Sequence, residues 1–187
     1  MKIRKATIQD AKGIGKVHVD SWRTTYKNIV PTDFLNNLSY EQRTHLWENH
    51  LLDETIYVLV AENERGEIIG FTSASKRETN PVPNSNYLDT LYLLEEYHGT
   101  GVGKQLFKEL FSYFNKRNYE KIFVEVLAEN KTRYFYEHFG AQFLKSIEIK
   151  IGGKVLEELV YEWTDINEVL NKIDNNDVYV IGDNIYE

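Results

Sequence analysis

The sequence predicts an α/β protein, closer to the α+β kind, in which helices flank a mixed central sheet of about six to seven strands within a single domain. Short runs rich in β-branched and aromatic residues recur along the chain and are typical of strands. Segments with apolar residues at spacings of three and four separate several of these runs and are typical of amphipathic helices. The length of 187 residues suits one hydrophobic core.

The first quarter of the chain predicts one strand followed by helices. A strand over residues 3–7 leads into a helix, because a Thr-x-x-Asp capping box follows it. Apolar and aromatic residues keep helical spacing as far as Tyr26, and Pro31 closes the segment. Two shorter helices are expected over residues 34–38 and 39–52.

The middle of the chain predicts an antiparallel hairpin and a third strand. Residues 55–61 and 68–72 are rich in β-branched residues, and the turn residues 63–66 lie between them. The polar segment 76–86 contains two prolines that disfavour a central strand, so it is expected to be a loop. A strand over 87–94 follows.

The later part of the chain predicts a strand, helix, strand unit and a second hairpin. Residues 101–116 show helical periodicity and lead into a strand over 119–127. A shorter aromatic helix is expected over 131–139. A Gly-Gly pair joins the strands 143–151 and 155–163, as in two-residue hairpin turns.

Residues 1–165 are therefore predicted to form the domain, and residues 166–187 an acidic, Asn-rich extension of unassigned role. A helix over 165–173 and a final strand over 178–181 are expected in this part of the chain. Packing against the domain, self-association and partial disorder all remain open for it.

Composition excludes several classes of function. The net charge of −7 disfavours nucleic acid as a partner, because phosphate binding needs clustered Lys and Arg. The absence of cysteine excludes a disulfide framework, a thiolate nucleophile and a cysteine-based zinc site. No apolar run approaches the roughly 20 residues that cross a bilayer, so no membrane partner is expected and the cytoplasm is the expected location.

No metal site is predicted. His45, Glu48 and His50 are the most suggestive group, but they lack the pair of histidines four residues apart that a zinc-protease helix requires. We interpret them as residues of an exposed helix.

A glycine-rich segment lies directly between a predicted strand and a predicted helix. Its residues are Tyr97, His98, Gly99, Thr100, Gly101, Val102, Gly103 and Lys104. Backbone N–H groups point outward at such a helix start, and the helix dipole adds partial positive charge. Glycines let a bound diphosphate approach the main chain closely. The segment therefore predicts an anion cradle, with a plain glycine-rich turn as the alternative.

Two familiar phosphate loops do not fit this spacing. A nucleotide-hydrolysing P-loop requires glycine in place of His98, and Ser or Thr in place of Gln105. A dinucleotide-binding fingerprint requires glycine in place of Lys104 and lies near the first strand of its domain. The anion is therefore expected to belong to another ligand.

The segment resembles the pyrophosphate-binding motif of the GNAT superfamily of N-acetyltransferases, written Arg or Gln, two residues, Gly, one residue, Gly or Ala. Here the motif positions are His98, Gly101 and Gly103, with histidine in place of Arg or Gln. The resemblance covers about residues 3–163. It includes Arg4-Lys5-Ala6-Thr7 and Asp10 at the start, Leu91-Tyr92-Leu93 before the loop, and Asn130 with Phe135-Tyr136-Glu137 after it.

The resemblance implies a GNAT fold in which two splayed strands hold acetyl-CoA as the acyl-donor cosubstrate, without a metal. Main-chain groups of Leu91 to Leu93 would pair with pantetheine, and the glycine-rich loop would bind the diphosphate. Asn130 would contact the cosubstrate, although an Asn before a helix is also an ordinary N-cap. The residues expected at acetyl-CoA are Leu91, Tyr92, Leu93, His98, Gly99, Thr100, Gly101, Val102, Gly103, Lys104, Asn130 and Tyr136.

The resemblance further implies N-acetyl transfer to a primary amine of a small molecule or peptide, by direct attack in a ternary complex. Tyr136 would be the general acid, and a core aromatic is the competing interpretation. Asp89 and Glu125 are candidates for the general base, with deprotonation through water as a third route. Trp22 and Tyr26 are candidate acceptor-binding residues, equally typical of an apolar helix face.

Two further alternatives stay open at this level. A protein that keeps the acyl-CoA site without catalysis would act as a sensor or interaction module, and an enzyme could use a longer acyl donor. A homodimer is an open alternative to a monomer, because relatives of this kind are often dimers.

Overall fold

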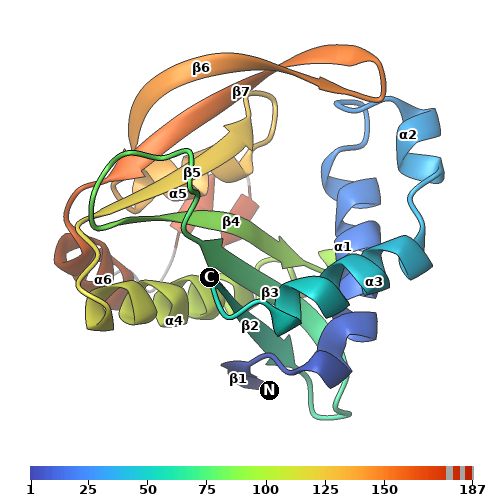
Figure 1. Ribbon diagram of the computed structural model, residues 1–187, viewed down its shortest axis with the longest axis horizontal. Coiled ribbons are helices and arrows are strands. Elements are labelled where there is room, and N and C mark those ends of the chain that lie inside the picture. The colour runs from blue at the N-terminus through green and yellow to red at the C-terminus, as the bar shows by residue number, and fades with distance from the viewer. Residues whose placement is uncertain (176–178, 182–183, 187) are drawn as a thin grey trace.

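Seven strands form one twisted sheet in the order β1-β2-β3-β4-β5-β7-β6 (Figure 1). The computed structural model describes the backbone of residues 1–175, 179–181 and 184–186, and the side chains of 1–175. The pair β4–β5 is parallel and the other neighbours are antiparallel. The prediction of a mixed sheet is confirmed. The strands are β1 (Lys2–Lys5), β2 (Ile56–Glu62), β3 (Ile68–Ser75), β4 (Ser85–Leu93), β5 (Lys121–Leu127), β6 (Gln142–Ile151) and β7 (Lys154–Trp163).

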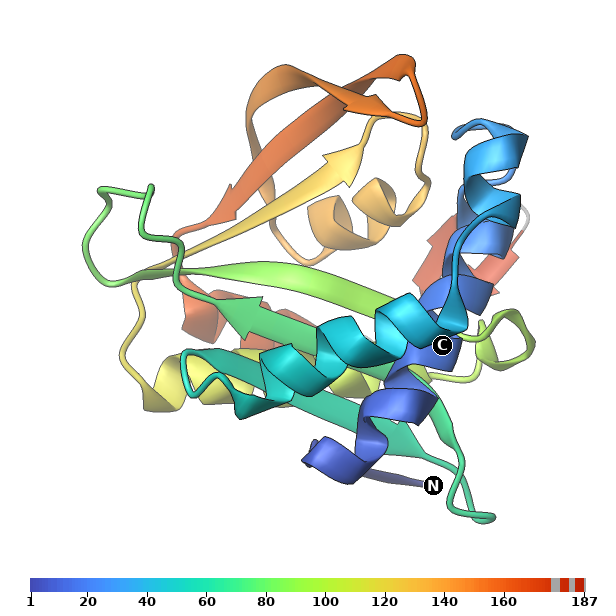
Figure 2. The same ribbon diagram turned by 45° about the vertical axis from the view of Figure 1, so that its right-hand side comes forward.

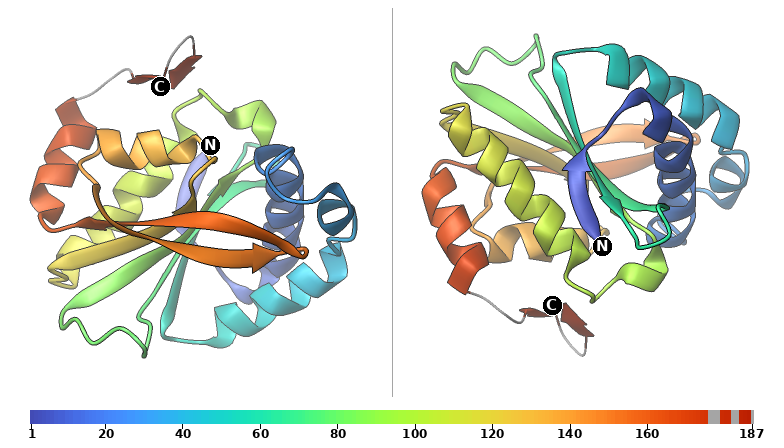
Figure 3. Two further views of the ribbon diagram at one scale, coloured as in Figure 1. Left: turned by 90° about the horizontal axis from the view of Figure 1, so that it is seen from above. Right: turned by 90° about the horizontal axis from the view of Figure 1, so that it is seen from below.

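Helices cover both faces of this sheet. In Figure 3 α1, α2 and α3 lie on one side, and α4, α5 and α6 lie on the other. The helical segments are η1 (Ile8–Asp10), α1 (Ala11–Thr25), α2 (Thr32–Asn36), α3 (Tyr40–Leu52), η2 (Glu95–Tyr97), α4 (Val102–Lys116), α5 (Thr132–His138) and α6 (Ile166–Asn175). Near the C-terminus, β8 (Tyr179–Ile181) pairs with β9 (Asn184–Tyr186), so a strand lies where the sequence predicts the last one.

The first strand is shorter than predicted because Thr7 serves the following turn. Thr7 and Asp10 form the predicted capping box, with the Thr7 N–H donating to the Asp10 carboxylate at 2.7 Å. Arg4 also donates to Asp10, at 2.8 Å. That guanidinium, with the Thr7 hydrogen bonds, holds the pKa of Asp10 below its ordinary value against the effect of burial. The strand ends at Lys5 as a result.

The main core lies between α4 and the sheet. The helical spacing predicts an apolar side of α4 made of Val102, Leu106, Leu110, Phe111 and Phe114, and all five are buried. The Phe107 ring joins them, with centroid distances of 4.4 Å to Phe111 and 5.7 Å to Trp163. Trp163 is nearly fully buried, and its indole donates to the Phe139 carbonyl at 3.0 Å. This packing anchors α5 against α4, and both helices adjoin the cavity described below.

Strands β4 and β5 pair over only part of their length. Their last paired residues are Leu88 and Val124, after which β4 stays with β3 and β5 stays with β7. A bulge leaves Asp89 without a partner on β3 at this point. The two ribbons separate toward α1 (Figure 1), which confirms the predicted splayed pair.

The β6–β7 hairpin arches toward the connection between α1 and α2 (Figure 2). Its turn glycine Gly152 lies against Phe34, where an added Cβ would come within 2.8 Å of that side chain. The Lys154 ammonium donates to the Ile29 carbonyl at 2.8 Å. The hairpin thus closes one side of the gap between β4 and β5. No helix in the part of the chain that the structure describes is long and apolar enough to span a membrane.

Helix α6 packs into the main core. Ile166, Val169 and Ile173 are buried in the same cluster as the α4 side chains. Lys108 of α4 and Asp174 of α6 form an ion pair at 2.5 Å on the exposed side. The sequence leaves three roles open for the segment 166–187. For its first ten residues, these contacts support packing against the domain.

We therefore expect Ile173→Ala to lower the free energy of unfolding by about 2–5 kcal/mol, because it leaves a cavity in a close-packed core. Urea unfolding measures this, with Asn171→Ala on the exposed face of α6 as the control. Equal stability of the two variants would show that α6 contributes little to the folded domain.

Candidate functional site

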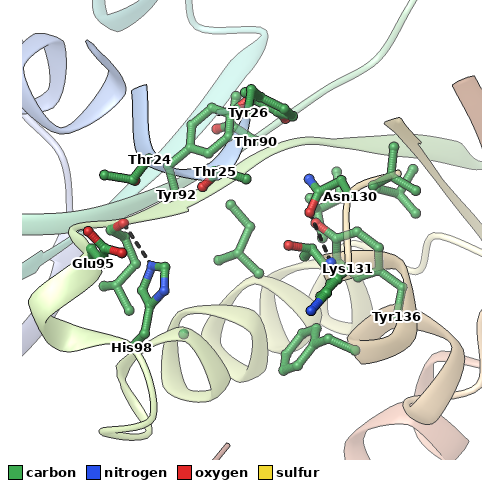
Figure 4. Close-up of a pocket in the computed structure, with 18 of the residues that line it drawn as sticks. Thr24, Thr25, Tyr26, Thr90, Tyr92, Glu95, His98, Asn130, Lys131 and Tyr136 are labelled. Carbon is green, nitrogen blue, oxygen red and sulfur yellow. Dashed lines mark hydrogen bonds between the residues drawn. The ribbon is translucent and has the colours of Figure 1, made fainter. Parts of the chain in front are cut away.

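A cavity of about 720 Å³ opens where β4 and β5 separate. Figure 4 shows Tyr26 and Tyr92 above this cavity, His98 at one flank, and Asn130 with Tyr136 at the other. The cavity brings together predicted residues from five parts of the chain, namely the end of α1, β4, the start of α4, β5 and the α5 region: Tyr26, Asp89, Leu91, Tyr92, Leu93, His98, Gly99, Gly101, Gly103, Lys104, Glu125, Asn130 and Tyr136. We name it the main cavity.

The glycine-rich start of α4 lies at one end of the main cavity. Gly99 and Gly101 have φ values of +73° and +81°, in the left-handed region that favours glycine. Gly101 is the N-cap of α4, so no side chain caps the first N–H groups of this helix. The first turn of α4 also carries no acidic residue. A Cβ added at Gly103 would meet no protein atom within 4 Å, so its backbone faces open cavity. The arrangement suits an anionic group.

Of the three other predicted loop residues Val102, Thr100 and His98, only His98 lines the main cavity. Val102 is buried in the core and does not line the main cavity. Thr100 does not line it either, and its hydroxyl donates to the Tyr97 carbonyl at 2.6 Å, which fixes the loop. His98 lines the cavity, with Nε2 at 3.2 Å from the Leu93 carbonyl oxygen (Figure 4). Val102 and Thr100 therefore shape the loop through packing and its internal hydrogen bond.

Peptide groups of β4 face the gap between the splayed strands. The Leu94 N–H donates to the Ile69 carbonyl at 3.0 Å, so the antiparallel ladder directs alternate residues of β4 to β3. The peptide groups of Leu91 and Leu93 then point away from β3, toward β5. The Leu93 carbonyl accepts from Ser21 at 3.0 Å, which ties α1 to this strand.

Asn130 is buried at the start of α5. Its side-chain oxygen accepts from the Thr132 N–H at 2.9 Å, while Lys131 occupies the N-cap position of α5, so Asn130 lies one residue before the cap. Asn130 also lines the main cavity, and its hydrogen bond orients the first turn of α5.

Tyr136 is buried in α5 and lines the main cavity. Its ring lies near Phe135 and Trp163 at centroid distances of 5.9 and 5.7 Å. Burial, with a smaller effect from Tyr92, raises the pKa of Tyr136 well above its ordinary value. The phenol therefore carries its proton at neutral pH, as a proton donor must.

The two aromatic candidates of α1 divide between core and cavity. Trp22 and Tyr26 pack edge to face with centroids 4.7 Å apart. Tyr26 is buried in a hydrophobic cluster with Leu35 and also lines the main cavity, and burial raises its pKa. Trp22 lies outside the main cavity and lines a smaller one.

This smaller cavity, of about 130 Å³, is named the side cavity. It shares six lining residues with the main cavity: Tyr26, Leu88, Asp89, Tyr92, Glu125 and Val126. Trp22, Arg77, Leu127, Ile151 and Glu158 line only the side cavity. The two predicted carboxylates, Asp89 and Glu125, thus lie where the two cavities meet.

An arginine connects these carboxylates. Arg77, from the loop between β3 and β4, donates to Glu125 at 2.7 Å and to Asp89 at 3.3 Å. Its guanidinium lies over the Tyr87 ring at 3.8 Å from the centroid. Burial raises the pKa of Asp89 above its ordinary value, although hydrogen bonds from Ser75 and the Arg77 charge oppose this effect.

Sequence reasoning missed Arg77 and Glu158. Arg77 lies within the polar segment 76–86, which the sequence identifies only as a loop. Glu158 is an unremarkable member of an alternating strand, and pairing of β7 with β5 brings it opposite Leu127. No local signal marks either residue, because each reaches the site through a contact with a distant part of the chain: Arg77 with Glu125, and Glu158 with Leu127.

Within the described part of the chain, no three His, Asp or Glu side chains lie together in a way that could hold a metal ion. His45 pairs instead with Glu48 at 2.8 Å on the exposed surface of α3.

The sequence is similar to known proteins. Residues 19–141 match the acetyltransferase (GNAT) family. The chain is similar to the uncharacterized N-acetyltransferase YuaI of Bacillus subtilis (strain 168), with 33% identity over 165 residues, 88% of this chain and 94% of that protein.

Solved structures share the fold at lower identity. The PaiA N-acetyltransferase of Thermoplasma acidophilum, solved with coenzyme A, has a TM-score of 0.72 and 22% identity, covering 88% of this chain and 98% of that one. The ribosomal-protein-alanine N-acetyltransferase of Brucella melitensis has a TM-score of 0.70 and 23% identity, covering 88% and 99%. With a family match over more than half of its length and a relative aligned over most of both sequences, this chain belongs to the GNAT family of acetyltransferases.

Proposed function

We propose that this acyltransferase moves an acetyl group from acetyl-CoA to a primary amine of a small molecule or peptide, by direct attack within a ternary complex. One observation carries the proposal: a single cavity joins an anion cradle, a buried phenol and two carboxylates. The chain has no cysteine for a thiolate acyl-enzyme, which favours direct attack.

The residues present fit coenzyme A. The open space over Gly103 and the uncapped start of α4 suit its diphosphate, and Lys104 lines the cavity beside them. The peptide groups of Leu91 and Leu93 suit the amides of pantetheine, which can pair with β4 as an added strand. Acetyl-CoA supplies the activated acyl group when bound.

Tyr136 and Leu93 have complementary roles in this proposal. The Tyr136 phenol donates a proton to the departing sulfur, so that no free thiolate has to form in a buried site. The Leu93 N–H donates to the carbonyl oxygen of the reacting acyl group as negative charge develops on it. Both groups are fixed by the fold, Tyr136 through its aromatic neighbours and Leu93 through the β3–β4 ladder.

We assign the general base to Asp89. The β4 bulge presents it at the junction of the cavities, and burial raises its pKa toward the range in which a carboxylate accepts protons effectively. Glu125 is the second candidate and forms the closer ion pair with Arg77.

This assignment predicts a pH dependence. The base must be unprotonated, so kcat/KM should fall as pH drops through the pKa of Asp89, which lies above the ordinary 3.8. Asp89→Asn should lower kcat/KM by roughly 100-fold or more and remove that acidic limb. Glu125→Gln should keep the limb. If kcat/KM of Asp89→Asn still fell at acidic pH as in the unmutated protein, the general base would be Glu125 or water.

The function itself is tested by measuring release of free thiol from acetyl-CoA with antibiotic, polyamine, amino-acid and peptide amines. Acetyl-CoA binding is measured in parallel by calorimetry. Turnover with one class of amine is the expected result. Tight binding with no thiol release from any amine would contradict the proposal and favour a non-catalytic sensor.

A further inference from the structure

The side cavity opens from the site of acyl transfer and has its own chemistry. Asp89 and Glu125 line both cavities, so an acceptor whose amine reaches the main cavity can extend past them. A volume of about 130 Å³ far exceeds the roughly 10–15 Å³ that one water molecule needs. The side cavity therefore has room for part of an acceptor.

Negative charge exceeds positive charge around the side cavity. Asp89, Glu125 and Glu158 contribute three carboxylates, and Arg77 is the cation among the lining residues. Arg77 contacts Asp89 and Glu125 at 3.3 and 2.7 Å. Three carboxylates against one guanidinium leave two negative charges in excess, and within the described residues Glu158 takes part in no ion pair.

The titration of Glu158 agrees with this excess. Burial raises the pKa of Glu158 above its ordinary value, and the Glu125 charge raises it further. Arg77 opposes both effects without cancelling them. A second cation beside Glu158 and Glu125 would relieve the repulsion between these carboxylates.

Two other features indicate a polar, elongated occupant. Trp22, Leu127 and Ile151 give the side cavity an apolar wall, which suits methylene groups. The guanidinium of Arg77, held by two carboxylates over an aromatic ring, shows that this environment already accommodates an organic cation.

We propose that the side cavity is a distal subsite for an acceptor with a second positive charge, an aliphatic diamine. This inference rests on the acetyltransferase function proposed above and names its substrate class. The reacting amine lies near Asp89, the methylene chain passes along Trp22, and the distal ammonium is bound by Glu158 together with Glu125. A carboxylate-bearing acceptor is disfavoured, because Arg77 is already neutralised by two carboxylates.

The test compares acceptors of equal length that differ at the distal end: 1,4-diaminobutane, pentylamine and 4-aminobutanoate. We expect kcat/KM for the diamine to exceed that for pentylamine by roughly 10- to 100-fold, the effect of one charge-assisted contact. The aminobutanoate should be the poorest acceptor. A diamine no better than pentylamine would overturn the proposal.

Glu158→Gln tests the anchor directly. It should lower kcat/KM for the diamine about 10-fold or more, mainly through KM, while kcat/KM for pentylamine changes little. Glu157→Gln is the matched control, because it removes the same charge from the adjacent, exposed position of β7. Equal losses for both acceptors in Glu158→Gln would show a structural effect and contradict a charge-selecting subsite.

Binding separates this proposal from the proposed function. Calorimetry measures 1,4-diaminobutane binding to the protein saturated with coenzyme A, which allows no turnover. Binding that Glu158→Gln abolishes and Glu157→Gln retains would support the subsite even if acetyl transfer were not observed. Absence of binding to the unmutated protein would overturn the subsite, whatever amine the enzyme acetylates.

Discussion

Tyr136→Phe is expected to lower kcat for acetyl transfer by roughly 100- to 10,000-fold, the contribution of a well-placed acid. The ring should keep its place, because Phe135 and Trp163 contact it through their aromatic faces and edges. Removing only the hydroxyl therefore takes away the proton and leaves the packing. The dissociation constant for acetyl-CoA should stay within about twofold, since the cradle at α4 is untouched.

The measurement pairs steady-state thiol release with calorimetric binding of acetyl-CoA. Tyr134→Phe is the matched control, because it removes a phenol from the same helix at an exposed position outside both cavities. Full activity in Tyr136→Phe would eliminate the acid role and restore the competing interpretation of Tyr136 as a core aromatic. Loss of acetyl-CoA affinity together with activity would point to a binding role instead.

Gly101→Val should weaken acetyl-CoA binding by more than 100-fold. Gly101 combines a φ of +81° with a place in the lining of the anion cradle. A β-branched residue is strained in this conformation, and relaxation of the strain would turn the first N–H groups of α4 away from the diphosphate. A side chain there would also occupy space that the ligand needs.

Gly66→Val is the control for strain alone. Gly66 has nearly the same φ, +79°, in the exposed turn between β2 and β3, and an added Cβ there meets no atom. Both variants should lose comparable stability, but only Gly101→Val should lose acetyl-CoA. Gly103→Val gives an independent check, because its side chain would enter the main cavity without any protein clash. Unchanged affinity in Gly101→Val and Gly103→Val would refute the cradle.

The fold was predictable because its signals are local. Helical spacing along α4 and the β-branched runs of β2 and β3 follow from contacts between residues close in sequence. The same holds for the glycine-rich loop, whose left-handed conformations depend on Gly99 and Gly101 themselves. Not every loop residue faces the main cavity, however: helical spacing places Val102 on the apolar side of α4, and it is buried in the core.

Residue patterns along the chain predict the sheet, its flanking helices and the loop at α4, and the family resemblance adds the candidate phenol. Long-range packing determines which groups meet: it presents Asp89 through a bulge, brings Glu158 beside β5, and places Arg77 between two carboxylates. It also packs α6 into the core. The physical reason is that strand pairing and side-chain packing join residues far apart in the chain, and the chemistry of an acceptor site depends on those long-range contacts.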